Sequence, residues 1–191
     1  MSLARQLAAD GRRVLLIDAD LKRPRALALL GDTRELDLVD LLAERAELDE
    51  VLRRDPASGA YYLGARRGVA GTRALLESRA MHRLMLHARE AYDVVIVDTP
   101  PLSVAADAAL VARDADACLY CVRWGSTPRD MMLQGLRLLA LCQIRVTGIV
   151  MSQVDTRRHR GYGYPQGQLM PPRPPQRLAD VTPGLEAPAP R

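Results

Sequence analysis

Two short segments decide the fold: residues 14–18 read Val-Leu-Leu-Ile-Asp, and residues 94–98 read Val-Val-Ile-Val-Asp. Each segment is a run of four apolar residues that ends in aspartate. Strands covered on both faces are apolar throughout, so both segments are predicted to be buried strands of a parallel sheet. The carboxyl ends of such strands meet at one edge of the sheet, and we therefore expect the two aspartates to face a common crevice.

The rest of the chain up to residue 155 alternates apolar runs with segments of helical period. This alternation predicts an α/β fold, with a mostly parallel sheet and helices on both of its faces. Further strands are expected at Cys118–Arg123 and Val146–Met151, with a weaker candidate at Tyr61–Gly64. Helices are expected at Ser2–Ala9, Asp37–Arg54, Thr72–Ala91, Val104–Ala112 and Pro128–Cys142. The last of these helices has Thr127 in position to cap it.

Composition indicates a soluble globular protein. Of the 191 residues, 48% are hydrophobic and 26% are charged, which is typical of that class. No apolar run approaches the roughly 20 residues of a membrane-spanning helix, and no signal peptide opens the chain, so a cytosolic setting is expected. The three cysteines are expected to be reduced. Cys118 and Cys121 have the spacing of a C-x-x-C motif, but residues three apart on a strand point to opposite faces.

Charge is distributed unevenly between two predicted parts of the chain. Residues 1–155 hold 21 basic and 21 acidic side chains, whereas residues 156–191 hold 6 and 2, which accounts for the net charge of +4. Eight of the 13 prolines also fall after residue 156. The predicted organisation is an α/β domain at residues 1–155 followed by a disordered, basic, proline-rich tail at residues 156–191.

The residues that follow the first strand indicate a cation site. Asp18 and Asp20 concentrate negative charge at the end of this strand. Mg²⁺ typically binds one or two carboxylates together with substrate phosphates and water. The cations Lys22, Arg23 and Arg25 come next in the sequence and suit a polyphosphate. The alternatives are that each aspartate only caps the following helix or turn, and that the basic residues form a solvated loop.

The residues that follow the second strand, Asp98-Thr99-Pro100-Pro101, give it the form of a Walker B element. In P-loop nucleotidases the aspartate of this element holds Mg²⁺. The main phosphate loop of such proteins, G-x-x-x-x-G-K-[ST], does not occur in this sequence. A parallel sheet normally has a strand before a helix such as Ser2–Ala9. We therefore expect an N-terminal strand and phosphate loop to be missing, and ATP to bind poorly unless they are supplied from elsewhere.

Three stretches together resemble the bacterial tyrosine kinases of capsule and exopolysaccharide biosynthesis. VLLIDADLKRP at Val14–Pro24 is similar to the second Walker motif of that family. YDVVIVDTPPLSVAADAALVARDADACLYCVRWGST at Tyr92–Thr127 is similar to its Walker B region and the strand after it. The glycine and tyrosine pair at residues 160–164 resembles its C-terminal tyrosine cluster. The resemblance implies a deviant P-loop fold and ATP-dependent phosphoryl transfer to tyrosine.

The resemblance also implies roles for individual carboxylates and tyrosines. Asp18 and Asp20 would be catalytic, with Asp18 as the base that accepts the proton of the tyrosine hydroxyl. Asp20 and Asp98 would hold Mg²⁺, directly or through water. Tyr162 and Tyr164 would be the phosphate acceptors, presented to a neighbouring subunit.

Further residues are implied to bind the nucleotide. Asp98, Thr99, Arg123 and Ser152 would contact ATP, and Ser152 stands where the family usually has an asparagine. Asp107 matches a position that the family often fills with aspartate, and its simplest interpretation is an exposed helical residue.

The resemblance implies partners and a location as well. The expected partners are a membrane-embedded polysaccharide co-polymerase or chain-length regulator and further copies of the chain, and no nucleic acid. The expected location is the cytoplasm, at the inner face of the plasma membrane. Two alternatives stay open: a catalytically impaired partner with the same fold, and a deviant-Walker ATPase of the partitioning or division-site kind.

Overall fold

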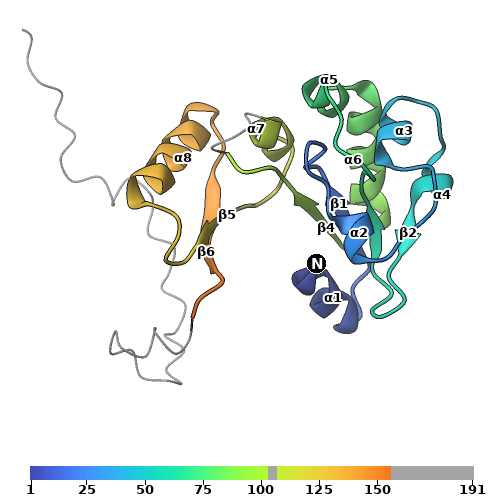
Figure 1. Cartoon of the computed structure of the whole chain (residues 1–191), viewed down its shortest axis with the longest axis horizontal. Coiled ribbons are helices and arrows are strands. Elements are labelled where there is room, and N and C mark those ends of the chain that lie inside the picture. Colours follow the sequence, from blue (N-terminus) through green and yellow to red (C-terminus); the bar gives the residue numbers. More distant parts are fainter. Residues whose placement is uncertain (103–106, 156–191) are drawn as a thin grey trace, which may run out of the picture. The chain divides into compact units, whose positions relative to one another are not determined.

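The computed structural model describes residues 1–102 and 107–155 (Figure 1). Residues Met1–Ser152 form one compact unit. The helices are α1 (Ser2–Ala9), α2 (Ala26–Leu29), α3 (Leu38–Leu42), α4 (Leu48–Val51), α5 (Thr72–Leu76), α6 (Arg79–Ala91), α7 (Asp107–Ala112) and α8 (Arg129–Leu141). The strands are β1 (Val14–Asp18), β2 (Arg53–Arg54), β3 (Tyr61–Leu63), β4 (Val94–Asp98), β5 (Cys118–Arg123) and β6 (Val146–Ser152).

The strands form two sheets rather than one. The larger sheet has the order β2-β3-β1-β4, and the smaller one contains only β5 and β6. Strand β1 runs parallel to β3 and to β4, β5 runs parallel to β6, and only β2 is antiparallel to its neighbour. The predicted α/β fold with a mostly parallel sheet is confirmed, and all five predicted strands are present.

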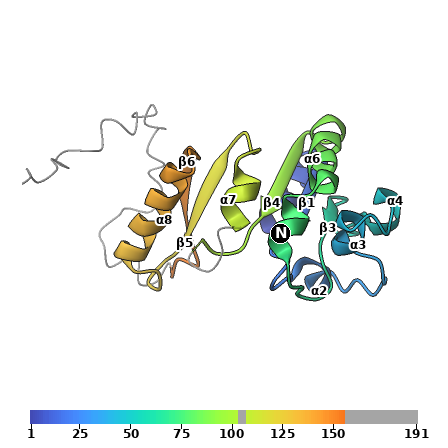
Figure 2. The ribbon, with the colours of Figure 1, turned by 90° about the horizontal axis from the view of Figure 1, so that it is seen from above.

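Helices cover both faces of the larger sheet, as predicted. Because side chains alternate along a strand, β1 contributes to two cores. Leu15 and Ile17 belong to the core that α3, α5 and α6 help to form, and Val14 and Leu16 pack on the other side with Ala4 of α1. None of these four residues of β1 is more than 5% exposed. Helix α8 lies against the β5–β6 sheet, where Leu139 and Ile144 form a small third core (Figure 2).

The single helix predicted at Thr72–Ala91 is wrong, because two helices with a break between them occupy this segment. Helix α5 ends at Leu76 and α6 begins at Arg79. Between them, Ser78 has an extended backbone, and its hydroxyl accepts a hydrogen bond from the backbone N–H of Met81 at 3.1 Å. A serine that satisfies a free N–H group in this way starts a new helix, so the apolar period continues across a break in the backbone.

The predicted helix at Asp37–Arg54 is also wrong, because two short helices and a strand occupy this segment. The Asp37 carboxylate caps α3 by accepting from the N–H groups of Val39 and Asp40. A second capping box, between Glu47 and Glu50, starts α4. Each cap fixes a helix start that the apolar period alone does not show.

The cap predicted for the last helix is likewise wrong. The N-cap residue of α8 is Pro128, and no side-chain hydrogen bond caps this helix. The Thr127 hydroxyl instead accepts a hydrogen bond from the backbone N–H of Arg123 at 3.2 Å. No helix in the described part of the chain is long and apolar enough to cross a bilayer.

The loop that leaves β1 is held close to the segment after β3. The backbone N–H of Val69 donates to the carbonyl oxygen of Leu21 at 2.9 Å. At Gly68, an added Cβ atom would overlap the carbonyl oxygen of Lys22. The absence of a side chain at Gly68 therefore lets the two backbones approach each other.

We predict that Gly68→Ala lowers the free energy of unfolding by about 1–3 kcal/mol, because the loop after β1 must move to admit the methyl group. Chemical denaturation monitored by circular dichroism measures this change. Gly148→Ala is the control, since the nearest atom to its added Cβ is Cδ2 of Leu119 at an ordinary 3.6 Å. Equal stability of the two variants would contradict the prediction.

Candidate functional site

The two strands with the same sequence format end at the same level of the larger sheet. In the parallel pairing of β1 with β4, Asp18 is the register partner of Asp98. The backbone N–H of Ala19 donates to the carbonyl oxygen of Asp98 at 2.8 Å, which continues the pairing past the end of β1. The predicted meeting of these two aspartates at one edge of the sheet is what the structure shows.

A cavity of about 250 Å³ lies at this edge. Its lining consists mostly of the residues singled out from the sequence, namely Asp18, Asp20, Arg23, Arg25, Asp98, Thr99 and Pro101. The three predicted carboxylates therefore share a cavity with two arginines. We call this feature the rim cavity.

Asp18 organises the loop that follows β1. Asp18 as a whole is only 4% exposed. One carboxylate oxygen accepts from the backbone N–H of Asp20 at 3.2 Å, and the other accepts from the N–H groups of Arg25 and Ala26, both at 2.9 Å. The last two donors stand at the start of α2, so Asp18 also satisfies the capping alternative considered for it.

Asp98 has a perturbed carboxyl group in the rim cavity. The pKa of its carboxyl is raised above the usual value, first by partial withdrawal from water and then by the negative charges of Asp18 and Asp20. The amino group of Met1 acts in the opposite direction. Since the side chain still has exposed surface, repulsion by the two neighbouring carboxylates is the contribution that a bound cation would reverse.

The donor set of the rim cavity fits Mg²⁺ bound together with phosphates rather than an all-protein metal site. Within residues 1–102 and 107–155, no three His, Cys, Asp or Glu side chains are arranged to hold a metal ion. Asp18 is already engaged by three N–H groups, and one oxygen of Asp20 accepts from the backbone N–H of Arg23 at 3.1 Å. The other oxygen of Asp20 and the carboxylate of Asp98 are therefore the groups that we consider as cation ligands. Two carboxylates suffice for Mg²⁺ when phosphate oxygens and water complete its coordination.

Lys22 does not line the rim cavity, because Asp107 binds it elsewhere. The Lys22 ammonium lies 3.0 Å from a carboxylate oxygen of Asp107, and the hydroxyl of Thr72 donates to the same oxygen at 2.8 Å. Asp107 is 7% exposed, so its interpretation as an exposed residue is wrong. It joins the loop after β1 to the first residues of α5 and α7. Sequence reasoning missed Thr72. No motif spacing links it to Asp107, which comes 35 positions later, or to Lys22, which Asp107 also binds.

Arg123 and Ser152 belong to the smaller sheet. They are the last residues of β5 and β6 and are register partners. The Ser152 hydroxyl donates to the carbonyl oxygen of Val122 at 3.4 Å, and the Ser152 carbonyl accepts from the N–H of Trp124 at 3.0 Å. Neither residue lines the rim cavity. The predicted acceptors Tyr162 and Tyr164 lie outside the described residues.

Comparisons with known proteins agree with the resemblance read from the sequence. The family described as "AAA domain" matches residues 1–140. Tyrosine-protein kinase YwqD of Bacillus subtilis is 29% identical over 163 residues, which cover 85% of this chain and 69% of YwqD. Succinoglycan biosynthesis transport protein ExoP of Rhizobium meliloti is 32% identical over 157 residues, which cover 81% of this chain and 20% of ExoP.

A solved structure supports the same conclusion. The kinase domain of Escherichia coli tyrosine kinase ETK superposes with a TM-score of 0.74 and 29% identity, over 81% of this chain and 62% of that one. The homologues of this chain thus include bacterial tyrosine kinases. The chain spans only about a fifth of the length of several curated relatives, from 20% to 22% of each.

We predict that Asp107→Asn lowers the free energy of unfolding at pH 7 by about 1 kcal/mol, because the charge that holds Lys22 is lost. The pKa of the Asp107 carboxyl is held below its usual value, first by the hydrogen bond from Thr72. Burial raises this pKa, whereas the hydrogen bond and the charge of Lys22 lower it further. A depressed pKa stabilises the folded state above the unfolded-state pKa of about 4, and this stabilisation is lost as the pH falls further.

Urea denaturation of wild type and Asp107→Asn between pH 7 and pH 3 measures the effect. The difference between the two proteins should be present at pH 7 and shrink below about pH 4. Asp10→Asn is the control, since Asp10 is exposed and, among the described residues, its carboxylate accepts a hydrogen bond from Gln6 alone. This substitution should change stability by less than about 0.5 kcal/mol. A difference that stays constant down to pH 3 would contradict the prediction.

Proposed function

The chain belongs to the AAA domain family, and we propose that it is the nucleotide-binding module of an ATP-dependent tyrosine autokinase that regulates exopolysaccharide synthesis and export. The observation that carries this proposal is the rim cavity. There the β1–β4 register sets Asp18 opposite Asp98, and Asp20, Arg23 and Arg25 join them. Carboxylates for a cation and arginines for an anion in one cavity suit a metal-bound polyphosphate.

We assign the residues of the rim cavity to separate tasks. Asp20 and Asp98 would hold Mg²⁺, which neutralises charge on the phosphates when bound. Arg23 and Arg25 would pair with phosphate oxygens. Asp18 would hold the loop in place through its three N–H donors. A carboxylate has about four acceptor positions, so one remains in our proposal to take the proton of a tyrosine hydroxyl.

The remaining nucleotide contacts and the acceptors are also proposals. Thr99 lines the rim cavity and would bind the nucleotide with Asp98. Arg123 and Ser152, at the carboxyl ends of β5 and β6, would contact it from the smaller sheet. Tyr162 and Tyr164 would accept phosphate from a neighbouring copy of the chain.

The relatives' names support the proposed biological setting. YwqD and ETK are named tyrosine kinases, and ExoP is named a succinoglycan biosynthesis transport protein. We propose a membrane-embedded polysaccharide co-polymerase as the partner of this chain, homo-oligomers as its assembly, and the inner face of the plasma membrane as its location. ATP and Mg²⁺ are the proposed cofactors.

A second candidate function is a catalytically impaired partner with the same fold. The observation that favours it is that Asp18, the proposed base, is only 4% exposed and already accepts hydrogen bonds from three backbone N–H groups. Such a chain would keep the rim cavity and engage an active kinase without transferring phosphate itself.

We predict that Mg²⁺ alone raises the melting temperature of the chain at pH 7, by roughly 3 °C at ten times the dissociation constant. The cation relieves the repulsion around Asp98, and Asp98→Asn should abolish the increase. The control Asp10→Asn should keep it. Differential scanning fluorimetry measures both, and an unchanged increase in Asp98→Asn would contradict the proposed metal site.

The same variant tests the electrostatics without metal. A raised carboxyl pKa favours the protonated form in the folded state, so ionised Asp98 destabilises the fold above that pKa. In the absence of Mg²⁺, Asp98→Asn should therefore melt slightly above wild type at pH 7. This advantage should disappear as the pH falls through the Asp98 pKa. A variant that melts below wild type at pH 7 would count against the repulsion.

We predict that the full chain gains phosphate on Tyr162 and Tyr164 when it is incubated with Mg²⁺ and with enough ATP to offset the weak binding expected without a G-x-x-x-x-G-K loop. Mass spectrometry locates the phosphotyrosines, and Asp20→Asn or Asp98→Asn should slow their formation at least about a hundredfold, as expected for lost transition-state electrostatics. Tyr61→Phe, which alters a tyrosine of β3, should leave the rate unchanged. Metal binding without any phosphotyrosine would favour the impaired partner instead.

A further inference from the structure

Three residues from separate elements meet at one carboxylate oxygen. Lys22 belongs to the loop after β1, and Thr72 and Asp107 are the first residues of α5 and α7. The Lys22 ammonium and the Thr72 hydroxyl both donate to the same oxygen of Asp107, at 3.0 and 2.8 Å. We call these three residues the Lys22 clamp.

Folding stability alone does not account for the Lys22 clamp. Thr72 and Asp107 are buried, and the hydroxyl gives the carboxylate a hydrogen bond without help from the lysine. The Lys22 side chain is 44% exposed, and a salt bridge with a partner so accessible to water contributes little to stability. The clear effect of the clamp is that it fixes where Lys22 places its charge.

The rim cavity lies within reach of the Lys22 side chain. Lys22 follows Asp20 by two residues, so the two backbones are at most roughly 7 Å apart. The lysine ammonium is a compact charge on a flexible four-carbon stem. None of the salt bridges found in the described part of the chain involves Asp18, Asp20 or Asp98. The rim carboxylates therefore offer this ammonium a second set of partners.

The backbone of the loop after β1 is held by contacts that do not depend on the clamp. Asp18 accepts from three N–H groups of the loop and the start of α2. The carbonyl oxygen of Leu21 accepts from the N–H of Val69, and Gly68 packs against the backbone of Lys22. Loss of the clamp should therefore release the lysine side chain while the loop backbone keeps its path.

We propose that Asp107 is a positioning residue, which keeps Lys22 out of the rim cavity and so leaves Asp20 and Asp98 free for Mg²⁺. This inference rests on the metal site proposed above. An ammonium beside these carboxylates would compete with Mg²⁺ for the same oxygens and would reduce the negative charge that attracts the cation. Thr72 contributes by fixing the orientation of the Asp107 carboxylate through its hydrogen bond.

Carbodiimide cross-linking of the full chain shows where Lys22 lies without any metal, because this reagent joins an amine to a carboxylate that is in contact with it. In wild type, we expect mass spectrometry to find Lys22 joined to Asp107. In Asp107→Asn, we expect at least about tenfold more Lys22 joined to Asp20 or Asp98 than in wild type. The asparagine keeps an oxygen for the Thr72 hydroxyl and removes only the charge. An unchanged yield of these rim cross-links would overturn the proposal.

Isothermal titration calorimetry with Mg²⁺ alone measures the consequence for the rim cavity. Asp107→Asn should bind Mg²⁺ at least about tenfold more weakly than wild type, because Lys22 then competes for the carboxylates. The double variant Asp107→Asn/Lys22→Gln should bind within about twofold of wild type, because no ammonium is left to enter the cavity. A double variant as weak as Asp107→Asn would show that Asp107 acts through the shape of the loop, and would overturn the proposal.

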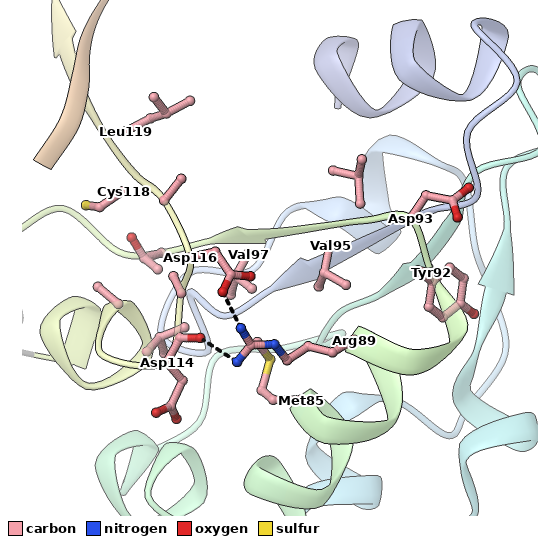
Figure 3. A pocket seen from close by; sticks show the side chains of 16 residues that line it. Met85, Arg89, Tyr92, Asp93, Val95, Val97, Asp114, Asp116, Cys118 and Leu119 are labelled. Atoms are coloured by element: carbon pink, nitrogen blue, oxygen red, sulfur yellow. Dashed lines mark hydrogen bonds and ion pairs between the residues drawn. The ribbon is translucent and has the colours of Figure 1, made fainter. Parts of the chain in front are cut away.

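Another ion pair provides the matched control. The Arg89 guanidinium donates to the carboxylate of Asp116 (Figure 3). The Arg89 side chain is 47% exposed, close to the value for Lys22, and neither member of this pair lines the rim cavity. Asp116→Asn should therefore release a cation of similar exposure and leave the affinity for Mg²⁺ unchanged. Equal weakening by Asp116→Asn and Asp107→Asn would indicate a general effect of charge and would overturn the proposal.

The two measurements separate this proposal from the metal site on which it rests. Wild type that binds no Mg²⁺ would overturn both. Wild type that binds Mg²⁺, together with an Asp107→Asn variant in which Lys22 forms no rim cross-links, would overturn the role of Asp107 and leave the metal site standing.

Discussion

The parallel pairing of β1 with β4 is the constraint on which the candidate site depends. Its register cannot slip by one residue, because Leu15 and Ile17 would then exchange cores with Val14 and Leu16. Burial of the strand therefore fixes Asp18 opposite its partner on β4. The carboxylates are held together by apolar packing beneath them and not by any attraction of their own. A fold that imposes such a repulsion has to compensate for it with donors or with a cation.

The compensation differs from one carboxylate to the next. The negative charge of Asp18 is stabilised by hydrogen bonds from three backbone N–H groups, and these bonds hold the loop after β1 in place. Asp107 draws Lys22 away from the cavity, so this lysine cannot neutralise the other carboxylates. Asp20 and Asp98 are left with two arginines in a cavity of mixed charge. Mixed charge favours a cation and an anion bound together over either alone, which is the electrostatic reason to prefer a metal-bound polyphosphate.

Sequence reasoning succeeded where a signal was local and failed where a contact was distant. Strand β1 could be predicted because an unbroken apolar run is sufficient to identify a covered strand. The break at Ser78 could not, because a hydroxyl that competes for a backbone N–H leaves the apolar period intact. Arg53 is fully buried in β2 and paired with Asp32 at 2.8 Å. Nothing near it in the sequence marks that partner, and the burial of Asp107 has the same cause.

The comparison of β1 with β4 shows that a sequence format does not by itself determine burial. Both strands read as four apolar residues and an aspartate. Yet only β1, which has a neighbouring strand on each side in the described part of the chain, is fully covered. The environment of Asp98 follows from the same fact, since it ends the less covered strand. Withdrawal from water and the charges of Asp18 and Asp20 act on its carboxyl group in the same direction, and a cation bound at the rim opposes both, because it favours the ionised form.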